Sequence, residues 1–110
     1  MIEYNDFEKV DIRVGRILEV LDFPEGTYSS HILKIDFGNE IGVKTSLARL
    51  KPNYQGNELV GKEIIGIVNL SPKKIGKHLS EALTLGLADK DGNVILVHPS
   101  KDVPLGGKLY

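Results

Sequence analysis

The feature that most constrains the fold is a long stretch of alternating apolar and polar residues, from Val10 to Val20. Such alternation is typical of a strand with one buried face. It is blurred around Gly15, where Arg16 takes an apolar position and Ile17 a polar one. We therefore predict one long strand that a glycine or a β-bulge bends, and a strand that bends midway can serve two sheets. The positions expected to face the core are Val10, Ile12, Val14, Leu18 and Val20.

The next part of the chain predicts an antiparallel hairpin. Leu33, Ile35 and Phe37 alternate with polar residues, a turn at residues 38–39 follows, and residues 41–46 alternate again. Residues 47–62 lack periodicity, which leaves room for only a short helical turn or two.

The second half predicts more strands. Residues 63–70 are apolar on both faces, which indicates a fully covered strand. Leu83, Leu85 and Leu87 are expected to supply another inward face, and their small partners, residues 84, 86 and 88, could accept a closely approaching element or ligand. Asp91-Gly92 predicts a hairpin turn before residues 94–97.

Five main strands, with glycines at the bends and little helix, predict an all-β fold. Their order fits a five-stranded OB-fold Greek-key barrel with short N- and C-terminal extensions, and an SH3-like barrel is the alternative. At 110 residues and 12.1 kDa, residues 1–110 are expected to form a single domain.

Several function classes lack their motifs in this sequence. The chain has no cysteine, and its three histidines are scattered, so we predict no metal site and no cofactor. No nucleophile, phosphate-loop or dinucleotide motif is present, so we do not expect an enzyme. Residues 1–10 contain neither a basic leader nor an apolar run, and no segment approaches membrane-spanning length. We expect a cytoplasmic protein with no membrane insertion.

The basic residues are unevenly distributed along a chain whose net charge is only −1. Two windows, residues 41–57 and 64–80, contain no acidic residue and hold six of the 14 basic ones. The remainder carries eight basic and 15 acidic residues, a net charge of −7. Phosphate binding follows the local potential, so the windows predict a polyanion site if they fold onto one face. Chance clustering on a solvated surface is the alternative.

Specific motifs accompany this charge. Residues 69–75, NLSPKKI, followed by Ser80-Glu81, resemble the signature of the tRNA-binding OB domain, which occurs in free-standing proteins and in some methionyl-tRNA synthetases. Residues 10–15, VDIRVG, resemble the opening strand of that family. Within it the chain is most similar to the CsaA-type proteins, which are associated with protein export as chaperones. The closer likeness lies in residues 23–25, 42–46, 80–83 and 103–108.

The resemblance implies structure-dependent binding of tRNA by its shape, with no DNA specificity. The residues expected to neutralise phosphates are Lys73, Lys74, Lys77, Lys44 and Arg49. Asn69, Ser46 and Ser80 could donate hydrogen bonds to phosphate or ribose groups. Alternatively, Asn69 caps a strand end, Ser80 satisfies the loop backbone, and the lysines only solvate a turn.

A second function remains open, in which the protein is a chaperone that binds unfolded export substrates. The substrates would bind in a groove at a dimer interface. The expected floor of this groove is formed by Gly66, Thr84 and Gly86, although these small residues also suit close packing of strands. The resemblance further implies a homodimer made through the chain extensions, which could instead form a lid over one end of the barrel. The expected interface residues are Tyr4, Phe7, Val97, Val103 and Leu105.

Overall fold

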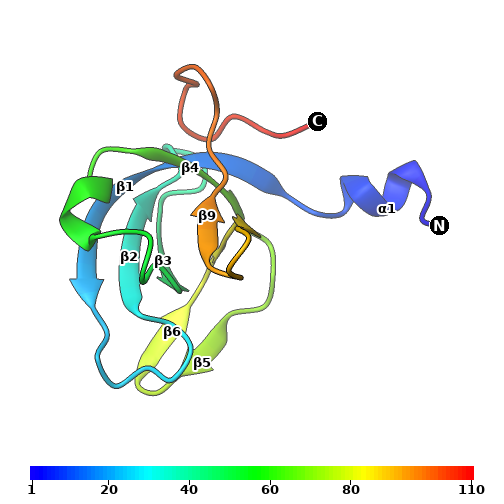
Figure 1. Ribbon diagram of the computed structural model, residues 1–110. Helices are drawn as coiled ribbons and strands as arrows, with labels where there is room; N and C mark the ends of the chain where they lie inside the picture. Colours follow the sequence, from blue (N-terminus) through cyan, green and yellow to red (C-terminus); the bar gives the residue numbers. More distant parts are fainter.

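A computed structural model describes residues 1–110 and has a nearly closed five-stranded antiparallel barrel at its centre (Figure 1). The strand order is β3-β2-β1-β4-β7. The barrel strands are β1 (Ile12–Asp22), β2 (His31–Asp36), β3 (Val43–Ala48), β4 (Glu63–Ile67) and β7 (Leu83–Thr84). The architecture confirms the predicted OB-like, almost all-β fold.

Smaller elements decorate the barrel. One two-stranded hairpin follows β4, and a second hairpin follows β7. Neither the five-residue helix before the barrel nor the 3-10 turn after β3 is long enough to cross a membrane. These elements are α1 (Tyr4–Glu8), the 3-10 helix η1 (Gly56–Leu59), β5 (Lys73–Ile75), β6 (His78–Ser80), β8 (Gly86–Ala88) and β9 (Val94–Leu96).

Strand β1 is the predicted bent strand, and two neighbours share it. Its first part pairs with β4 from Ile12 to Arg16, and its second part pairs with β2 from Arg16 to Asp22. At the bend, a Cβ on Gly15 would lie 2.6 Å from the side chain of Ile35, so only glycine allows this close approach.

The inward face of β1 differs from the prediction: Ile12 and Val14 are buried outside the barrel core cluster, while Gly15 faces Ile35 and Phe37. The register shifts between Ile17 and Glu19, so Leu18 sits in a bulge and is exposed, while Ile17 is fully buried. The expectation that Leu18 faces the core was therefore wrong. A bulge changes which residues face inward, and simple alternation cannot follow that change.

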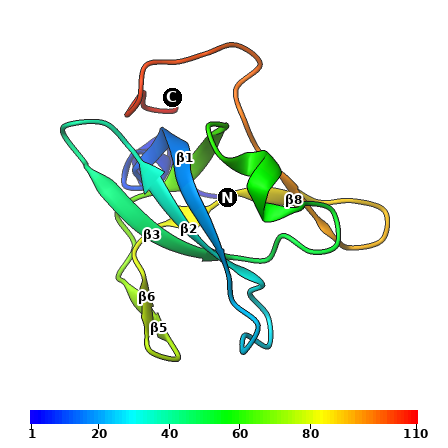
Figure 2. The ribbon, with the colours of Figure 1, turned by 90° about the vertical axis from the view of Figure 1, so that its left-hand side faces the viewer.

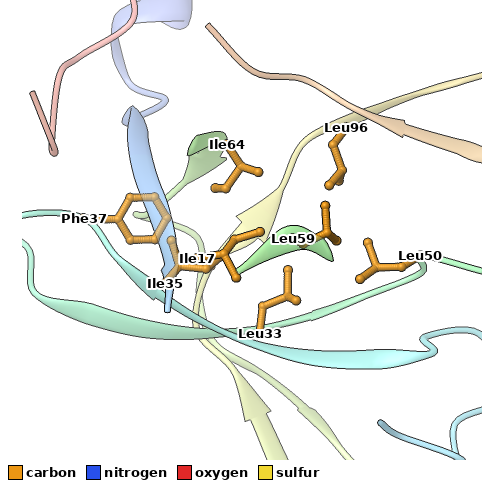
Figure 3. Packing of buried hydrophobic residues seen from close by; sticks show 9 residues of the cluster. Ile17, Leu33, Ile35, Phe37, Leu50, Leu59, Ile64 and Leu96 are labelled. Carbon is orange, nitrogen blue, oxygen red and sulfur yellow. The ribbon is translucent and has the colours of Figure 1, made fainter. Parts of the chain in front are cut away.

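The barrel interior holds one apolar cluster of nine buried residues. Leu33, Ile35 and Phe37 of the β2 segment are fully buried there, as predicted. Figure 3 shows side chains from several strands and from η1 converging on this cluster. Its members are Ile17, Leu33, Ile35, Phe37, Leu50, Leu59, Ile64, Ala82 and Leu96.

A second, smaller apolar cluster holds the β5–β6 hairpin against the barrel. Phe23 from the β1–β2 loop, Ile32 from β2 and Leu47 from β3 are buried together, and Ile75 of the hairpin packs against them. The edge of the His78 ring meets Phe23, with ring centroids 5.3 Å apart. The hairpin and the β1–β2 loop therefore lie side by side at one end of the molecule (Figures 1 and 2).

Leu83 and Leu87 of the β7–β8 segment face outward, so the prediction that they face inward was wrong, while Leu85 is half-buried. Leu83 is 47% exposed and Leu87 is 68% exposed. Thr84 points inward instead, since its hydroxyl lies 2.8 Å from that of the buried Ser46, whereas Gly86 and Ala88 are exposed. At the β7 strand the alternation was therefore read correctly, but the inward and outward faces were exchanged.

Side chains close the seam between β3 and β7. The Ser80 hydroxyl accepts a hydrogen bond from the Leu47 amide at 3.1 Å, and the Glu81 carboxylate accepts one from the Thr45 amide at 2.9 Å. The Glu81 amide donates to the Thr45 carbonyl at 2.7 Å. No backbone ladder joins β3 to β7, so Ser80 and Glu81 provide acceptors for amides of β3 that would otherwise be unpaired.

The C-terminal segment pairs with the first part of β1, on the edge that β2 leaves free. Residues 106–109 run antiparallel to its first part: the Val14 amide donates to the Gly107 carbonyl and the Leu109 amide donates to the Ile12 carbonyl, both at 2.9 Å. Helix α1 projects away from the barrel and buries no residue (Figure 1).

Candidate nucleic-acid interface

The β5–β6 hairpin presents the predicted lysines to solvent. Lys73, Lys74 and Lys77 are all exposed, and none of them forms a salt bridge. Gly76 begins the tight turn with φ +60°, a conformation that glycine adopts readily. Because Ile75 packs against the barrel, the three ammonium groups are carried on a supported hairpin that projects from one end of the molecule (Figure 2).

The two acid-free windows lie next to each other. Strand β3, from the first window, runs beside β6, from the second. A hollow of about 370 Å³ separates the hairpin from the barrel, and Lys34 and Lys77 both line it. The only acidic residue of this hollow is Glu81, whose carboxylate already accepts the Thr45 amide. The hairpin, the adjoining strand β3 and Lys34 therefore form one basic region, whereas Arg49 of the first window lies elsewhere, beside Tyr28.

Lys34 is a basic residue of this region that the sequence reasoning missed. It lies on the outer face of β2, where its ammonium group donates to the Thr45 hydroxyl at 2.8 Å. Asp36 follows two residues later on the same strand, so no charge pattern distinguishes Lys34 in the sequence. Only the packing of the hairpin over this face brings Lys34 near Lys77.

Ser46 cannot contact RNA in this conformation, which corrects the sequence prediction. Its side chain is fully buried, and its hydroxyl is hydrogen-bonded to Thr84 inside the barrel. Ser80 is half-buried, and its hydroxyl is already engaged by the Leu47 amide. Both serines contribute to closing the barrel. Lys44 is half-buried on β3 and is close in sequence to the seam they form.

Asn69 joins the end of β4 to the chain before β1. Its Oδ1 atom accepts the Asp11 amide at 2.9 Å, and its Nδ2 atom donates to the Lys9 carbonyl at 2.7 Å. Both ends of the side chain are therefore occupied. This geometry favours the capping interpretation of Asn69 over direct contact with RNA.

Replacing Asn69 with alanine is expected to lower the free energy of unfolding by about 1–2 kcal/mol, because two hydrogen bonds are lost. Denaturant titration measures this change. Asn57→Ala is the matched control, since Asn57 is exposed and makes no side-chain hydrogen bond, and it should leave stability unchanged. A loss of tRNA affinity at unchanged stability would instead assign Asn69 to RNA contact.

Arg49 lies apart from the hairpin lysines, beside the β1–β2 loop. Its guanidinium carbon is 5.4 Å from the centroid of the Tyr28 ring, and its Nη2 atom lies 3.4 Å from Oδ1 of Asn93. Tyr28 is a second residue that the sequence reasoning missed. A single aromatic residue in a loop carries no periodic signal.

The three small residues predicted to form the floor of a peptide groove do not line one hollow together; they are Gly66, Thr84 and Gly86. A Cβ on Gly66 would lie 3.1 Å from the Phe37 ring, so this glycine serves close strand packing. Thr84 and Gly86 line a different hollow of about 370 Å³ beside Tyr28. The close-packing alternative therefore accounts for Gly66.

The expected dimer residues are spread over two areas. The rings of Tyr4 and Phe7 on helix α1 are tilted toward each other with centroids 5.9 Å apart, and Tyr4 is largely exposed. Val97 extends β9 beside β4, because its carbonyl accepts the Ile65 amide at 3.1 Å. Val103 and Leu105 are half-buried in the segment that leads back to β1.

Three exposed apolar side chains lie on β7, β8 and β9. They are Leu83, Leu87 and Ile95, and we call these three residues the outer leucine face; Leu83 and Leu87 also line the hollow beside Tyr28. Leu87 and Ile95 are directly opposite each other in the β8–β9 hairpin. Contiguous apolar exposure of this kind is typical of an interaction surface.

One hydrogen-bonded chain superficially resembles catalytic machinery. Nε2 of His31 lies 3.2 Å from the Asp22 carboxylate, and its Nδ1 lies 2.8 Å from the Ser30 hydroxyl. The Ser30 hydroxyl also accepts the Leu50 amide at 2.8 Å. This serine is therefore committed to holding the loops, and no cluster of metal-ligating residues accompanies it.

Two side chains with shifted pKa values lie outside the basic region. A hydrogen bond to Asp11 raises the pKa of Arg13. A hydrogen bond from Asn53, together with backbone amides, lowers the pKa of Asp89 in the β8–β9 turn. The Asp89 carboxylate thus stabilises the fold at neutral pH, and this contribution is lost as the pH falls through its lowered pKa.

The fold corresponds to a known class of RNA-associated domain. Residues 12–108 match the family model described as "Putative tRNA binding domain", and the chain belongs to this family. Among solved structures, the CsaA chaperone protein of Picrophilus torridus is 47% identical and superposes with a TM-score of 0.92, each chain being covered completely. The chaperone CsaA of Bacillus anthracis is 34% identical, also with a TM-score of 0.92, over 100% of this chain and 99% of that one.

The same domain is found within a larger enzyme. The methionine–tRNA ligase of Pyrococcus horikoshii is 42% identical over 108 residues, which cover 98% of this chain. The match covers only 14% of that enzyme's length. The chain therefore corresponds to one small part of the ligase.

Proposed function

We propose that the protein is a non-catalytic, structure-dependent tRNA-binding protein of the CsaA type, and that its β5–β6 hairpin grips the RNA backbone. The observation that carries this proposal is the group of three exposed, unpaired lysines on a supported hairpin beside a second acid-free strand. Membership of the tRNA-binding domain family supports tRNA as the polyanion.

Backbone contact fits the chemistry of these side chains. Lysine ammonium groups contact phosphates as point charges and carry no base-reading geometry. Duplex RNA hides its major-groove edges, so a protein of this kind recognises RNA by shape. The acidic remainder of the chain, with a net charge of −7, would confine binding to the basic region.

Titration of purified protein with tRNA at several salt concentrations tests the proposal. We expect the logarithm of the affinity to fall linearly with the logarithm of salt concentration, with a slope of about one for each phosphate contacted. An unfolded model polypeptide, titrated in parallel, should show almost no salt dependence if it binds through apolar contacts. Absence of tRNA binding at low salt would overturn the proposal.

We further propose that the protein is a homodimer in which the outer leucine face and the chain extensions meet. Leu83, Leu87 and Ile95 expose apolar surface that a monomer leaves in water. Helix α1 projects from the barrel and could pack against a second copy. Symmetric pairing is the commonest way for such a surface to be buried.

The second candidate function is that of a chaperone for unfolded export substrates. It is favoured by the apolar hollow that Thr84, Gly86 and Leu87 line, and by the CsaA chaperones among the similar structures. Unfolded polypeptide would then be a partner besides tRNA. Both functions suit a cytoplasmic setting, which we propose for the protein.

A further inference from the structure

The β1–β2 loop displays an aromatic side chain that the core does not use. Tyr28 is 71% exposed, although Arg49 lies over its ring with the guanidinium carbon 5.4 Å from the centroid. Most of the phenol ring therefore remains available to a ligand. An exposed aromatic ring beside a cation is the side-chain pair that single-stranded nucleic acids use for base stacking.

The loop that carries Tyr28 is anchored at both ends. Phe23 is buried in the second apolar cluster, and its amide donates to the Ser30 carbonyl at 2.9 Å. The Ser30 amide donates to the Ala48 carbonyl, also at 2.9 Å. Tyr28 therefore extends from a short loop whose ends are held, which reduces the entropy lost when a ligand stacks on it.

Tyr28 stands between two hollows of different chemistry. One, of about 370 Å³, is mainly apolar and contains no acidic residue; Leu47, Leu87 and Val94 are among its lining residues. The other, of about 330 Å³, is mainly polar, and Arg49 and Lys51 line it. Asp22 is the one acidic residue there, and its carboxylate lies 3.2 Å from the His31 ring.

We propose that Tyr28, Arg49 and Lys51 form a binding site for an unpaired nucleotide of RNA. The base stacks on Tyr28 next to the apolar hollow, and Arg49 and Lys51 contact its phosphate. The two hollows match two parts of a nucleotide, the aromatic face of the base and the anionic phosphate. This inference rests on the proposed function and adds a class of ligand to it.

The loop that carries Tyr28 adjoins the lysine hairpin at its first residue. Phe23, at the start of the Tyr28 loop, contacts His78 of the hairpin, so the loop and the hairpin are direct neighbours. An RNA whose duplex lies on Lys73, Lys74 and Lys77 can therefore extend a single strand toward Tyr28. Arg49 and Lys51 favour RNA over an apolar peptide, because a peptide needs no cation at this position.

The test compares two RNA hairpins with the same stem. One ends blunt, and the other ends in a four-nucleotide 3′ overhang that contains 2-aminopurine. We expect the overhang to increase the affinity for the wild-type protein by about tenfold, the gain from stacking one base. We also expect 2-aminopurine fluorescence to be quenched on binding.

Tyr28→Ala should abolish both the affinity gain and the quenching, with the affinity for the blunt hairpin unchanged. Tyr28→Phe is the matched control and should keep both, because it retains the ring. Equal affinity of the wild-type protein for both hairpins would overturn this inference alone. Failure to bind either hairpin would overturn the proposed function as well. A Tyr28→Ala defect confined to an unfolded model polypeptide would reassign the site to peptide binding.

Discussion

Replacing Lys73, Lys74 and Lys77 together with alanine is expected to lower the affinity for tRNA about a hundredfold at about 50 mM salt. Each lysine lies on the exposed β5–β6 hairpin, so each can neutralise one phosphate and release its counterion. The slope of log affinity against log salt should become shallower by about three. Titrations at several salt concentrations measure both effects.

The matched control for this variant removes three lysines elsewhere. Lys9, Lys62 and Lys101 are exposed and lie outside both acid-free windows, so their replacement by alanine makes the same change in net charge. That variant should retain nearly all of the affinity and the slope. Equal losses in the two variants would show that overall charge binds the RNA, and the hairpin would lose its assigned role.

Replacing Leu83 and Leu87 together with glutamate is expected to convert a dimer into a monomer and to weaken association at least about a hundredfold. A carboxylate buried in an apolar contact costs several kcal/mol, and 1.4 kcal/mol corresponds to a factor of ten. The barrel itself should remain folded, because both leucines already face water in the single chain. Sedimentation velocity gives the association state, and circular dichroism gives the folded state.

Leu18→Glu is the control for this variant. Leu18 has an exposed fraction of 47%, equal to that of Leu83, but it lies in the bulge of β1 away from the outer leucine face. The Leu18 variant should dimerise like the wild-type protein. A wild-type protein that sediments as a monomer at micromolar concentration would contradict the dimer proposal outright.

Local sequence patterns predicted the barrel well where a strand has one buried face and one solvent-exposed face. The alternation of Leu33, Ile35 and Phe37 led directly to the buried face of β2, and Gly15 marked the bend in β1. Each of these features is encoded within a few residues. The family motifs then favoured the OB-fold topology for the predicted strands over an SH3-like barrel.

The predictions that failed depended on what lies across the barrel. Alternation identifies two faces of a strand but not which one is inside, and Leu83 was assigned to the wrong one. The inside was decided by Ser46, whose hydroxyl meets Thr84 from a strand 38 residues away. The same contact buries Ser46 and removes it from the RNA-binding surface.

The candidate site was predicted in part for a similar reason. Lysines that are adjacent in sequence, such as Lys73 and Lys74, could be found by counting charges. Lys34 and Tyr28 could not be found in this way. Lys34 comes near the hairpin, and Tyr28 comes near Arg49, only after the chain has folded. The amide of Asn69 looked equally suited to RNA or to capping, and only its two backbone partners distinguished them.

The pairing of residues 106–109 with the first part of β1 has a consequence for how this domain combines with others. It brings the entrance and the exit of the barrel to neighbouring positions on one edge, since the Leu109 amide bonds to the Ile12 carbonyl. A domain whose ends adjoin can be carried by a longer polypeptide without disturbing its interior. The barrel is in this sense a portable module, which suits the occurrence of its relatives both as short chains and as a small part of a ligase.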